Sequence, residues 1–310
     1  MTSGKIIITC AIEGDVHTPT MSGVLPYTAH KIAEHSVAAV KAGASILHLH
    51  ARDRETGAPT ADPDAYMQLL PRINQATDAV VNITTGGGVT MSLAERLAAP
   101  LRAKPEMCAL NMGSMNCAVF GAAEKPYEWN QLWGKPYPPG TDNINFHNTF
   151  NEIESVLRIL GEEHGTRFEH ECYDIGHLYT LAYFADHGLI KPPFFIQNIF
   201  GILGGIGADM RNLMFMKETA DRLFGDDYRW SVLAAGRNQI TYATQAAVMG
   251  GNVRVGLEDN LYIGKDKRAS GNAEQVVKIR RIVEELGMQV ATPAEARTML
   301  DLKGRDLVGF

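Results

Sequence analysis

Eight short apolar runs alternate with longer segments of helical periodicity along this chain. Each run has the length of a strand, and several are apolar at almost every position, which is typical of parallel strands covered on both faces. We therefore predict eight parallel strands. They span residues 5–12, 45–50, 79–84, 107–112, 167–173, 194–201, 229–235 and 252–257.

Capping residues bound the helical segments between these runs. Thr28 can accept a hydrogen bond at the start of a helix over 29–42, and Gly43 can end that helix. Asp62 and the proline after it open another helix, because proline suits the first helical position. Later helices cover 152–163, 175–187, 209–224 and 239–249, or start at Ser270 and Pro293. Eight strand–helix units without a change in composition predict one α/β domain over 1–310, a (β/α)8 TIM barrel.

One stretch interrupts this alternation. Residues 118–149 follow the fourth strand and are rich in aromatic residues, proline and glycine. A segment of this length without a strand or helix pattern is unusual in a compact domain. We predict an insertion into the barrel there, which forms a lid, an oligomer contact or an ordered surface excursion.

Composition narrows the classes of function. Of the 310 residues, 45% are hydrophobic and 21% are charged, as in an ordinary globular protein, and the net charge is −6. This acidic balance argues against nucleic acid or an anionic membrane as a partner. No apolar run reaches about 18 residues, and no signal peptide is recognisable. The four cysteines lack metal-type spacing, so we expect reduced thiols in a cytoplasmic protein.

The second strand carries two histidines near its end. Because side chains alternate along a strand, His48 and His50 lie on one face and the leucines beside them on the other. The leucines suit packing against helices, so the imidazoles face the barrel mouth, where barrel enzymes place their active sites. A divalent metal such as zinc would satisfy them, and a hydrogen-bonded pair of core histidines is the alternative. Glu169 and Glu171 on the fifth strand are candidates to orient such ligands.

A third metal ligand must come from another strand end, since catalytic zinc usually takes three protein ligands. Glu258 and Asp259 directly follow the last strand. We predict one zinc ion per chain, held by His48, His50 and Glu258, although a carboxylate that caps the next segment has the same spacing. Arg254 lies on the same strand. With Asp259 beside it, Arg254 binds an anionic substrate or tunes a base, or the two form a structural salt bridge.

Further candidates follow the third and fourth strands. Thr84 ends the third strand, and the glycines after it let the backbone approach a ligand closely. Asn111 ends the fourth strand. We expect Thr84, Gly86, Gly87 and Asn111 to contact the substrate, with a plain tight turn as the alternative for the glycines. Together these residues predict a metal-dependent barrel that acts on a small, polar, anionic substrate.

At these residues the sequence resembles the beta-keto acid cleavage enzyme family, and the resemblance extends from Ile6 to Leu302. It rests on segments that lie in order at strand ends. The segments are 9–14, 43–52, 82–87, 104–111, 236–237 and 254–260. The resemblance implies a TIM barrel, a zinc ion and usually a homotetramer. It also implies the reaction, in which a beta-keto acid and acetyl-CoA give acetoacetate and a new acyl-CoA.

The resemblance assigns roles to individual residues of this chain. It implies that zinc is bound by His48, His50 and Glu258. It further implies that Arg254 and Asp259 form the dyad that removes the C2 proton of the substrate. Thr84 stands where the family has a serine that hydrogen-bonds the substrate.

Two positions bear on the choice of substrate. The aminohexanoate enzyme of this family has a glutamate that holds the substrate amine where this chain has Val16, and a threonine where this chain has Ala109. Both differences argue against an aminohexanoate substrate. The alternative is that Glu13 or Asp15, which lie close to Val16 in the sequence, holds a cationic group. On the runs 111–116 and 201–205, the chain resembles the dehydrocarnitine-type branch more closely.

A metal-dependent hydrolase of the amidohydrolase type is the alternative enzyme, because it also uses H-x-H in a barrel. There the pair lies on the first strand, with histidine ligands on strands five and six. Here the pair falls on the second strand. His170 lies on the fifth, but the sixth ends in Gln197 and Asn198.

Overall fold

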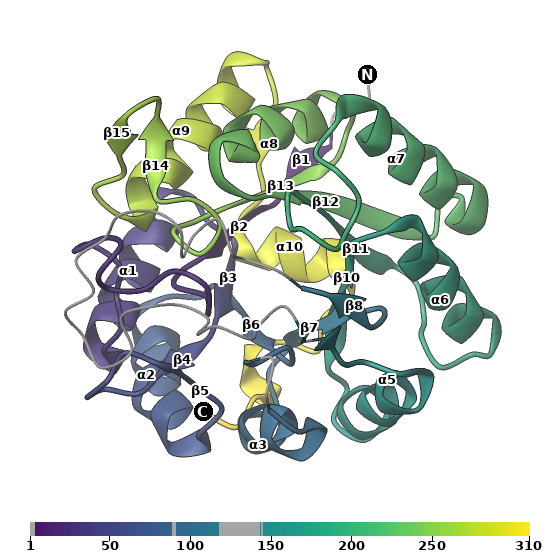
Figure 1. The fold of residues 1–310 in the computed structure, drawn as a ribbon, viewed down its shortest axis with the longest axis horizontal. Coiled ribbons are helices and arrows are strands. Elements are labelled where there is room, and N and C mark those ends of the chain that lie inside the picture. Colours follow the sequence, from purple (N-terminus) through teal and green to yellow (C-terminus); the bar gives the residue numbers. More distant parts are fainter. Residues whose placement is uncertain (1–3, 89–90, 118–142, 144) are drawn as a thin grey trace.

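The computed structural model describes residues 4–88, 91–117, 143 and 145–310. Eight parallel strands close into a barrel in chain order, with helices around the outside (Figure 1). The barrel strands are β2 (Ile8–Ala11), β3 (Ile46–Leu49), β6 (Val80–Thr84), β7 (Met107–Asn111), β10 (Arg167–Cys172), β11 (Phe194–Phe200), β12 (Tyr228–Ala234) and β13 (Asn252–Val255). Each predicted run supplies one of them, so the predicted TIM barrel is confirmed.

The helices pack their apolar faces against the outer face of the barrel, except for α10, which lies across one end of it. They are α1 (Ala29–Ala42), α2 (Pro63–Ala76), α3 (Leu93–Ala103), α5 (Phe150–Val156), α6 (Ile175–Asp186), α7 (Met210–Phe224), α8 (Gln239–Val248), α9 (Asn272–Glu285) and α10 (Pro293–Leu300). Thr28 accepts a hydrogen bond from the Lys31 N–H, and Gly43 ends α1, both as predicted. The predicted helix over 152–163 starts earlier, because Thr149 caps it, and it continues as the π-helix η2 (Leu157–Glu162).

The first predicted strand, 5–12, is wrong in one respect, because it divides into two. β1 (Lys5–Ile6) pairs outside the barrel with β16 (Gln289–Val290), and only β2 joins the barrel.

At one end of the barrel, side chains from five barrel strands or their flanks pack against α10, which closes this end. This apolar plug contains Ile7, Ile46, Val80, Met107, Phe195, Ala291, Ala296 and Leu300. The predicted metal ligands and substrate-binding residues therefore lie nearer the other end.

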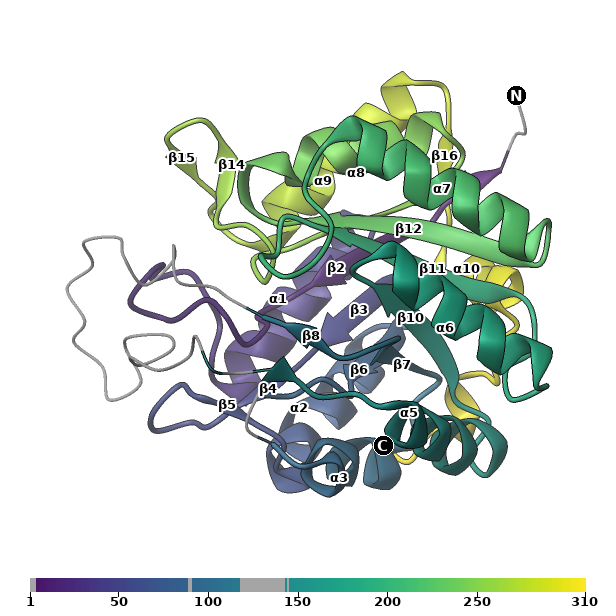
Figure 2. The same cartoon turned by 45° about the vertical axis from the view of Figure 1, so that its right-hand side comes forward.

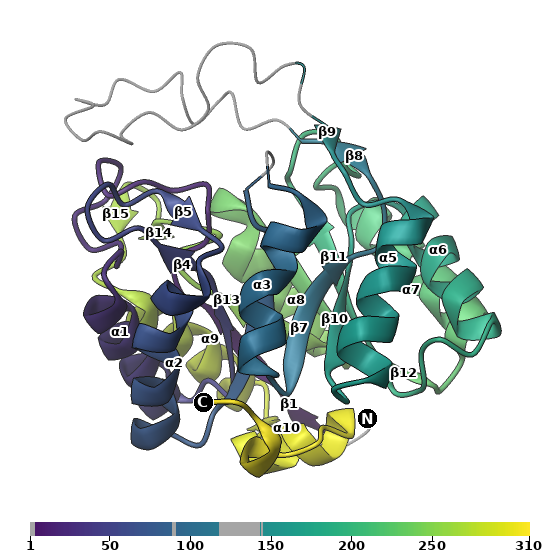
Figure 3. The ribbon, with the colours of Figure 1, turned by 90° about the horizontal axis from the view of Figure 1, so that it is seen from below.

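Short antiparallel strand pairs surround the mouth at that other end, opposite α10 (Figures 2 and 3). They are β4 (Ala51–Arg52) with β5 (Pro59–Thr60), β8 (Met115–Asn116) with β9 (Asn145–Phe146), and β14 (Tyr262–Gly264) with β15 (Lys267–Arg268). The predicted insertion over 118–149 lies largely outside the described residues, but β8 and β9 bring its two ends together. Within the described ranges, no helix combines the length and the apolar character needed to cross a membrane.

Candidate active site

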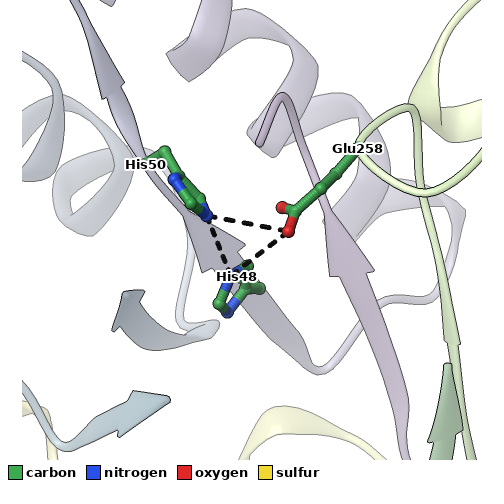
Figure 4. A group of neighbouring side chains, drawn as sticks. All are labelled: His48, His50 and Glu258. Atoms are coloured by element: carbon green, nitrogen blue, oxygen red, sulfur yellow. Dashed lines mark hydrogen bonds and ion pairs between the residues drawn. The ribbon is translucent and has the colours of Figure 1, made fainter. Parts of the chain in front are cut away.

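Two histidines and a glutamate meet inside the mouth of the barrel (Figure 4). Nε2 of His48 lies 3.3 Å from Nε2 of His50, and each of these atoms lies 3.6 Å from Oε1 of Glu258. The histidines come from β3 and the residue after it, and share one face of the strand. Glu258 follows β13, and Figure 4 shows its carboxylate pointing toward both rings. The structure thus brings together the three predicted ligands.

The spacing of these three atoms fits a zinc ion. Tetrahedral zinc binds nitrogen and oxygen at about 2.0–2.2 Å, so two of its ligand atoms lie roughly 3.3–3.5 Å apart. The separations of 3.3 and 3.6 Å agree with that geometry. In the described part of the chain, Oε2 of Glu258 is buried and has no hydrogen-bond partner. A cation between the three side chains would balance the negative charge of this carboxylate.

Gly14 determines where the side chain of Glu258 lies. Its φ is +58°, and a Cβ at this position would fall 2.2 Å from Cγ of Glu258. Glycine alone adopts this backbone conformation freely and leaves the space. Glu258 also donates its backbone N–H to the carbonyl oxygen of Ala11 at 3.3 Å. The loop after β2 and the end of β13 therefore position the carboxylate ligand together.

Arg52 holds the loop after β2 in place. Its guanidinium donates to the backbone carbonyl oxygens of Glu13, Gly14 and His17 at 3.1, 2.6 and 2.7 Å. Oε1 of Glu13 in turn accepts the backbone N–H of His50 at 2.8 Å. Burial raises the pKa of Glu13 to about 8. The sequence analysis did not predict these contacts of Arg52 and Glu13. Arg52 binds backbone carbonyl groups of a loop far from it in the chain, and a backbone partner has no recognisable sequence motif.

Arg254 and Asp259 form a buried pair beside the three ligands. Nε and Nη2 of Arg254 donate to the two carboxylate oxygens of Asp259 at 3.0 and 3.1 Å. Nη2 also donates to Oε1 of Glu258 at 2.7 Å. The Arg254 side chain is 1% exposed. The structure thus joins the predicted dyad to the predicted metal ligand through one guanidinium.

Burial and charge act in opposite directions on these groups. Burial raises the pKa of Asp259 to about 6, although Arg254 opposes that shift. Burial would also raise the pKa of Glu258, but the attraction of Arg254 and the two histidines outweighs it and holds the pKa well below its usual range. Burial lowers the pKa of His48 well below its usual value, whereas at His50 the charge of Glu258 outweighs burial and raises the pKa to about 9, so a metal would displace a proton from His50. A neutral imidazole and an ionised carboxylate are the forms that bind a metal.

Glu169 and Glu171 approach the arginine. Oε1 of each lies 3.5 and 3.6 Å, respectively, from Nη1 of Arg254. Burial raises the pKa of Glu169 to about 7 and that of Glu171 to about 8. The sequence suggested both as partners of the metal-binding histidines. Their ion pairs in the structure are with Arg254.

A cavity above the three ligands contains the remaining predicted residues. Thr84, Gly86, Gly87 and Asn111 all line it, together with the ligands and the dyad. Oγ1 of Thr84 accepts the Gly86 N–H at 3.0 Å, which shapes the turn. Asp15, His17, Glu171 and Tyr173 also line the cavity. Six larger apolar side chains complete the wall, and of these only Val16 was singled out from the sequence. They are Val16, Met115, Phe146, Ile199, Ile202 and Leu233.

The hydrolase alternative requires histidine ligands on the fifth and sixth strands. His170 lies on β10 between Glu169 and Glu171, which both approach Arg254 inside the barrel, so its ring lies on the outer face. There it contacts the ring of Phe168, with 6.1 Å between centroids. The metal-type cluster found among the described residues does not include it. The hydrolase hypothesis therefore has no support.

Residues 5–302 match the beta-keto acid cleavage enzyme family. The chain is 52% identical to 3,5-dioxohexanoate:acetyl-CoA acetone transferase of Paraburkholderia graminis, over 100% of this chain and 99% of the relative. It is 37% identical to 3-keto-5-aminohexanoate cleavage enzyme of Fusobacterium nucleatum, over 96% and 98% of the two chains. It is 33% identical to 3-dehydrocarnitine:acetyl-CoA trimethylamine transferase of Rhizobium meliloti, over 97% and 98%. These identities do not place the dehydrocarnitine-type enzyme nearer than the aminohexanoate enzyme.

The solved structure of apo ObcA shares the fold. Its TM-score is 0.71 at 20% identity, and the match covers 91% of this chain and 66% of ObcA. The family match extends over nearly the whole chain, and the three relatives align almost from end to end. The chain belongs to the beta-keto acid cleavage enzyme family.

Proposed function

We propose that this protein is a zinc-dependent acyltransferase that converts a beta-keto acid and acetyl-CoA into acetoacetate and a new acyl-CoA. The observation that carries this proposal is the meeting of His48, His50, Glu258 and the Arg254–Asp259 pair in one cavity. Two of the three relatives described above carry acetyl-CoA in their names. Carbon–carbon cleavage by acyl transfer needs what such a cavity offers, namely charge stabilisation and a base.

His48, His50 and Glu258 would hold the zinc ion. Bound zinc acts as a Lewis acid on keto and carboxylate oxygens and so increases the acidity of C2. Arg254 contacts Glu258 directly and supplies a second positive charge next to this position. That charge favours the enolate that forms when C2 loses its proton.

Asp259 is the proton acceptor that the geometry favours. The resemblance left open which member of the dyad takes the C2 proton. Burial lowers the affinity of Arg254 for its proton, but Asp259 and Glu258 outweigh burial and hold the arginine pKa well above its usual value. Arg254 therefore stays charged, and Asp259 accepts the proton while Arg254 orients it.

The reaction then balances without a further reagent. The C2 enolate attacks the acetyl carbonyl of acetyl-CoA, and the CoA thiolate leaves. The thiolate adds to the C3 carbonyl, the C2–C3 bond breaks, and acetoacetate departs after C2 regains a proton. Thr84, Gly86, Gly87 and Asn111 line the cavity and would contact the substrate oxygens.

An uncharged acyl chain is the substrate feature that Val16 and the relative at 52% identity support. Val16, Ile199, Ile202 and Leu233 provide no partner for an ammonium group, and Asp15 is the acidic residue beside Val16 in this cavity. The relative at 52% identity is named for 3,5-dioxohexanoate. We therefore propose 3,5-dioxohexanoate or a close neutral analogue as the keto acid, which would give acetoacetyl-CoA as the acyl product.

A substrate panel tests this proposal. Purified protein is incubated with acetyl-CoA and 3,5-dioxohexanoate, 3-keto-5-aminohexanoate or 3-dehydrocarnitine, and acetoacetate and acyl-CoA are quantified. We expect the first acid to react fastest and every turnover to require the thioester. Elemental analysis should find one zinc per chain, and a chelator should abolish turnover until zinc is restored. Full activity in metal-free protein, or product release without acetyl-CoA, contradicts the proposal.

The homotetramer and the cytoplasmic location remain predictions from the family resemblance and the composition. Light scattering of the purified protein measures the first. A mass near four times 33.9 kDa supports the tetramer, and a monomer mass contradicts it.

A further inference from the structure

We propose that Arg237 and the β14–β15 hairpin bind the phosphate groups of coenzyme A, an inference that rests on the proposed use of acetyl-CoA. Arg237 lies in the 3-10 turn η3 (Gly236–Asn238) at the carboxyl end of β12, and η3 packs against β14. The hairpin adds Lys265, Lys267 and Arg268, and all four cationic residues are exposed. We call these four residues the basic strip.

The basic strip adjoins the mouth of the catalytic cavity. Leu233, near the end of β12, and Ala235, which directly precedes η3, line that cavity. The backbone N–H of Gly236 donates to the carbonyl oxygen of Asp259 at 2.8 Å, so η3 is fastened to the loop that bears the dyad carboxylate. The hairpin lies among the segments around the mouth in Figure 3. A thioester inside the cavity can therefore lie beside Asp259 while its distal groups lie outside, on the strip.

The distribution of charge separates the two ends of such a ligand. The cavity is lined by the acidic residues Asp15, Glu171, Glu258 and Asp259 and by Arg254, which is already paired with Glu258 and Asp259. The chain as a whole carries a net charge of −6. Coenzyme A carries a diphosphate and a 3′-phosphate at the end remote from its thiol, and exposed cations attract these groups. Cations at the rim hold the phosphates outside and leave the uncharged thioester arm to enter.

Most cations of the strip have no competing strong partner. Among the described residues, no hydrogen bond or ion pair involves the guanidinium of Arg237 or the ammonium of Lys265. Lys267 lies 3.9 Å from Glu274, at the limit of an ion pair on the surface. Arg268 lies over the ring of Tyr262 and donates to the carbonyl oxygen of Met21, which holds the hairpin in place. Arginine binds phosphate through two parallel hydrogen bonds, so Arg237 is the principal contact we expect.

Binding measurements test this assignment without turnover. Titration calorimetry compares coenzyme A, dephospho-coenzyme A, pantetheine and inorganic phosphate as ligands of the zinc-loaded protein. We expect Arg237→Ala to weaken the binding of coenzyme A about tenfold. The triple variant Arg237→Ala, Lys265→Ala and Lys267→Ala should weaken this binding about a hundredfold. Pantetheine binding should not change. Arg229→Ala removes the same charge from the opposite end of β12 and is the matched control.

Kinetics give an independent readout. In Arg237→Ala the KM for acetyl-CoA should rise about tenfold, with kcat and the KM for the keto acid unchanged. S-acetyl-pantetheine should be used equally by the variant and the parent protein. Equal losses with both thioesters, no loss with either, or phosphate alone binding as tightly as coenzyme A would overturn the inference. A parent protein that binds coenzyme A through the strip yet forms no acetoacetate would instead contradict the proposed function.

Discussion

Gly14 and Glu258 are packed so closely that a single methyl group cannot fit between them. The Cβ of any other residue at position 14 would lie 2.2 Å from Cγ and 2.8 Å from the carboxylate carbon of Glu258. The two residues come from opposite ends of the chain and meet because the first and last barrel strands are neighbours. This contact sets the position of the carboxylate among the proposed zinc ligands.

We expect Gly14→Ala to weaken zinc binding about ten- to a hundredfold, as when other groups that orient a metal ligand are changed. The methyl group must displace Glu258, and the backbone at φ +58° disfavours alanine. Competition with a zinc-binding dye measures the affinity. Gly23→Ala is the control, because a Cβ there meets nothing within 4 Å. Equal zinc affinity in the two variants would show that Gly14 does not control the ligand.

Asp259→Asn should reduce kcat about a hundred- to ten-thousandfold, the usual contribution of a general base. Asparagine keeps the shape of the side chain and one hydrogen bond to Arg254, but it cannot take the C2 proton. Exchange of the C2 hydrogen in deuterated water, followed by NMR without acetyl-CoA, isolates this step. Asp186→Asn, at an exposed helix end, should exchange normally. Undiminished exchange in the Asp259 variant would assign the base elsewhere.

Val16→Glu should shift the preference toward a cationic substrate. A carboxylate in the apolar part of the cavity favours an ammonium group and penalises a neutral chain. We expect kcat/KM for 3-keto-5-aminohexanoate to rise about tenfold, and that for 3,5-dioxohexanoate to fall by a similar factor. In Val16→Gln the new side chain is nearly the same size as glutamate but carries no charge. This variant should lower the activity toward both acids. A parallel response of the two variants would mean that volume, not charge, determines the choice.

His170 should make stability depend on pH. Burial lowers its pKa to about 3, whereas an unfolded histidine has a pKa near 6.5. Below pH 6.5 the unfolded chain therefore binds a proton that the folded chain does not, so this residue costs about 2 kcal/mol of unfolding free energy at pH 5 and almost nothing at pH 7.5.

Urea denaturation of the parent protein and His170→Gln at these two pH values measures the effect. The difference in unfolding free energy between them should shift by about 2 kcal/mol in favour of the variant as the pH falls to 5. Other titrating groups cancel in this comparison. A constant difference would mean that His170 is charged in the folded protein.

Periodicity alone was enough to place the histidine pair. Alternation along one strand puts His48 and His50 on the same face, and the leucines beside them assign that face to the interior. The same local logic located all eight barrel strands. It failed where the partner is remote, since β1 leaves the barrel only because β16 lies beside it.

The sequence by itself determined the barrel, the two histidines and the family. Each follows from local period, from caps, or from a set of short motifs in order. Only the tertiary structure decided that Gly14 leaves the space for Glu258 and that Glu169 and Glu171 approach Arg254. It also placed Ile199, Ile202 and Leu233 together in the apolar wall of the cavity. Those relations join residues far apart in the chain, and barrel closure alone sets their distances. The sequence around a carboxylate such as Glu258 suits both a metal ligand and a cap of the next segment. Which of the two it is depends on the groups that closure of the barrel brings within about 4 Å of it.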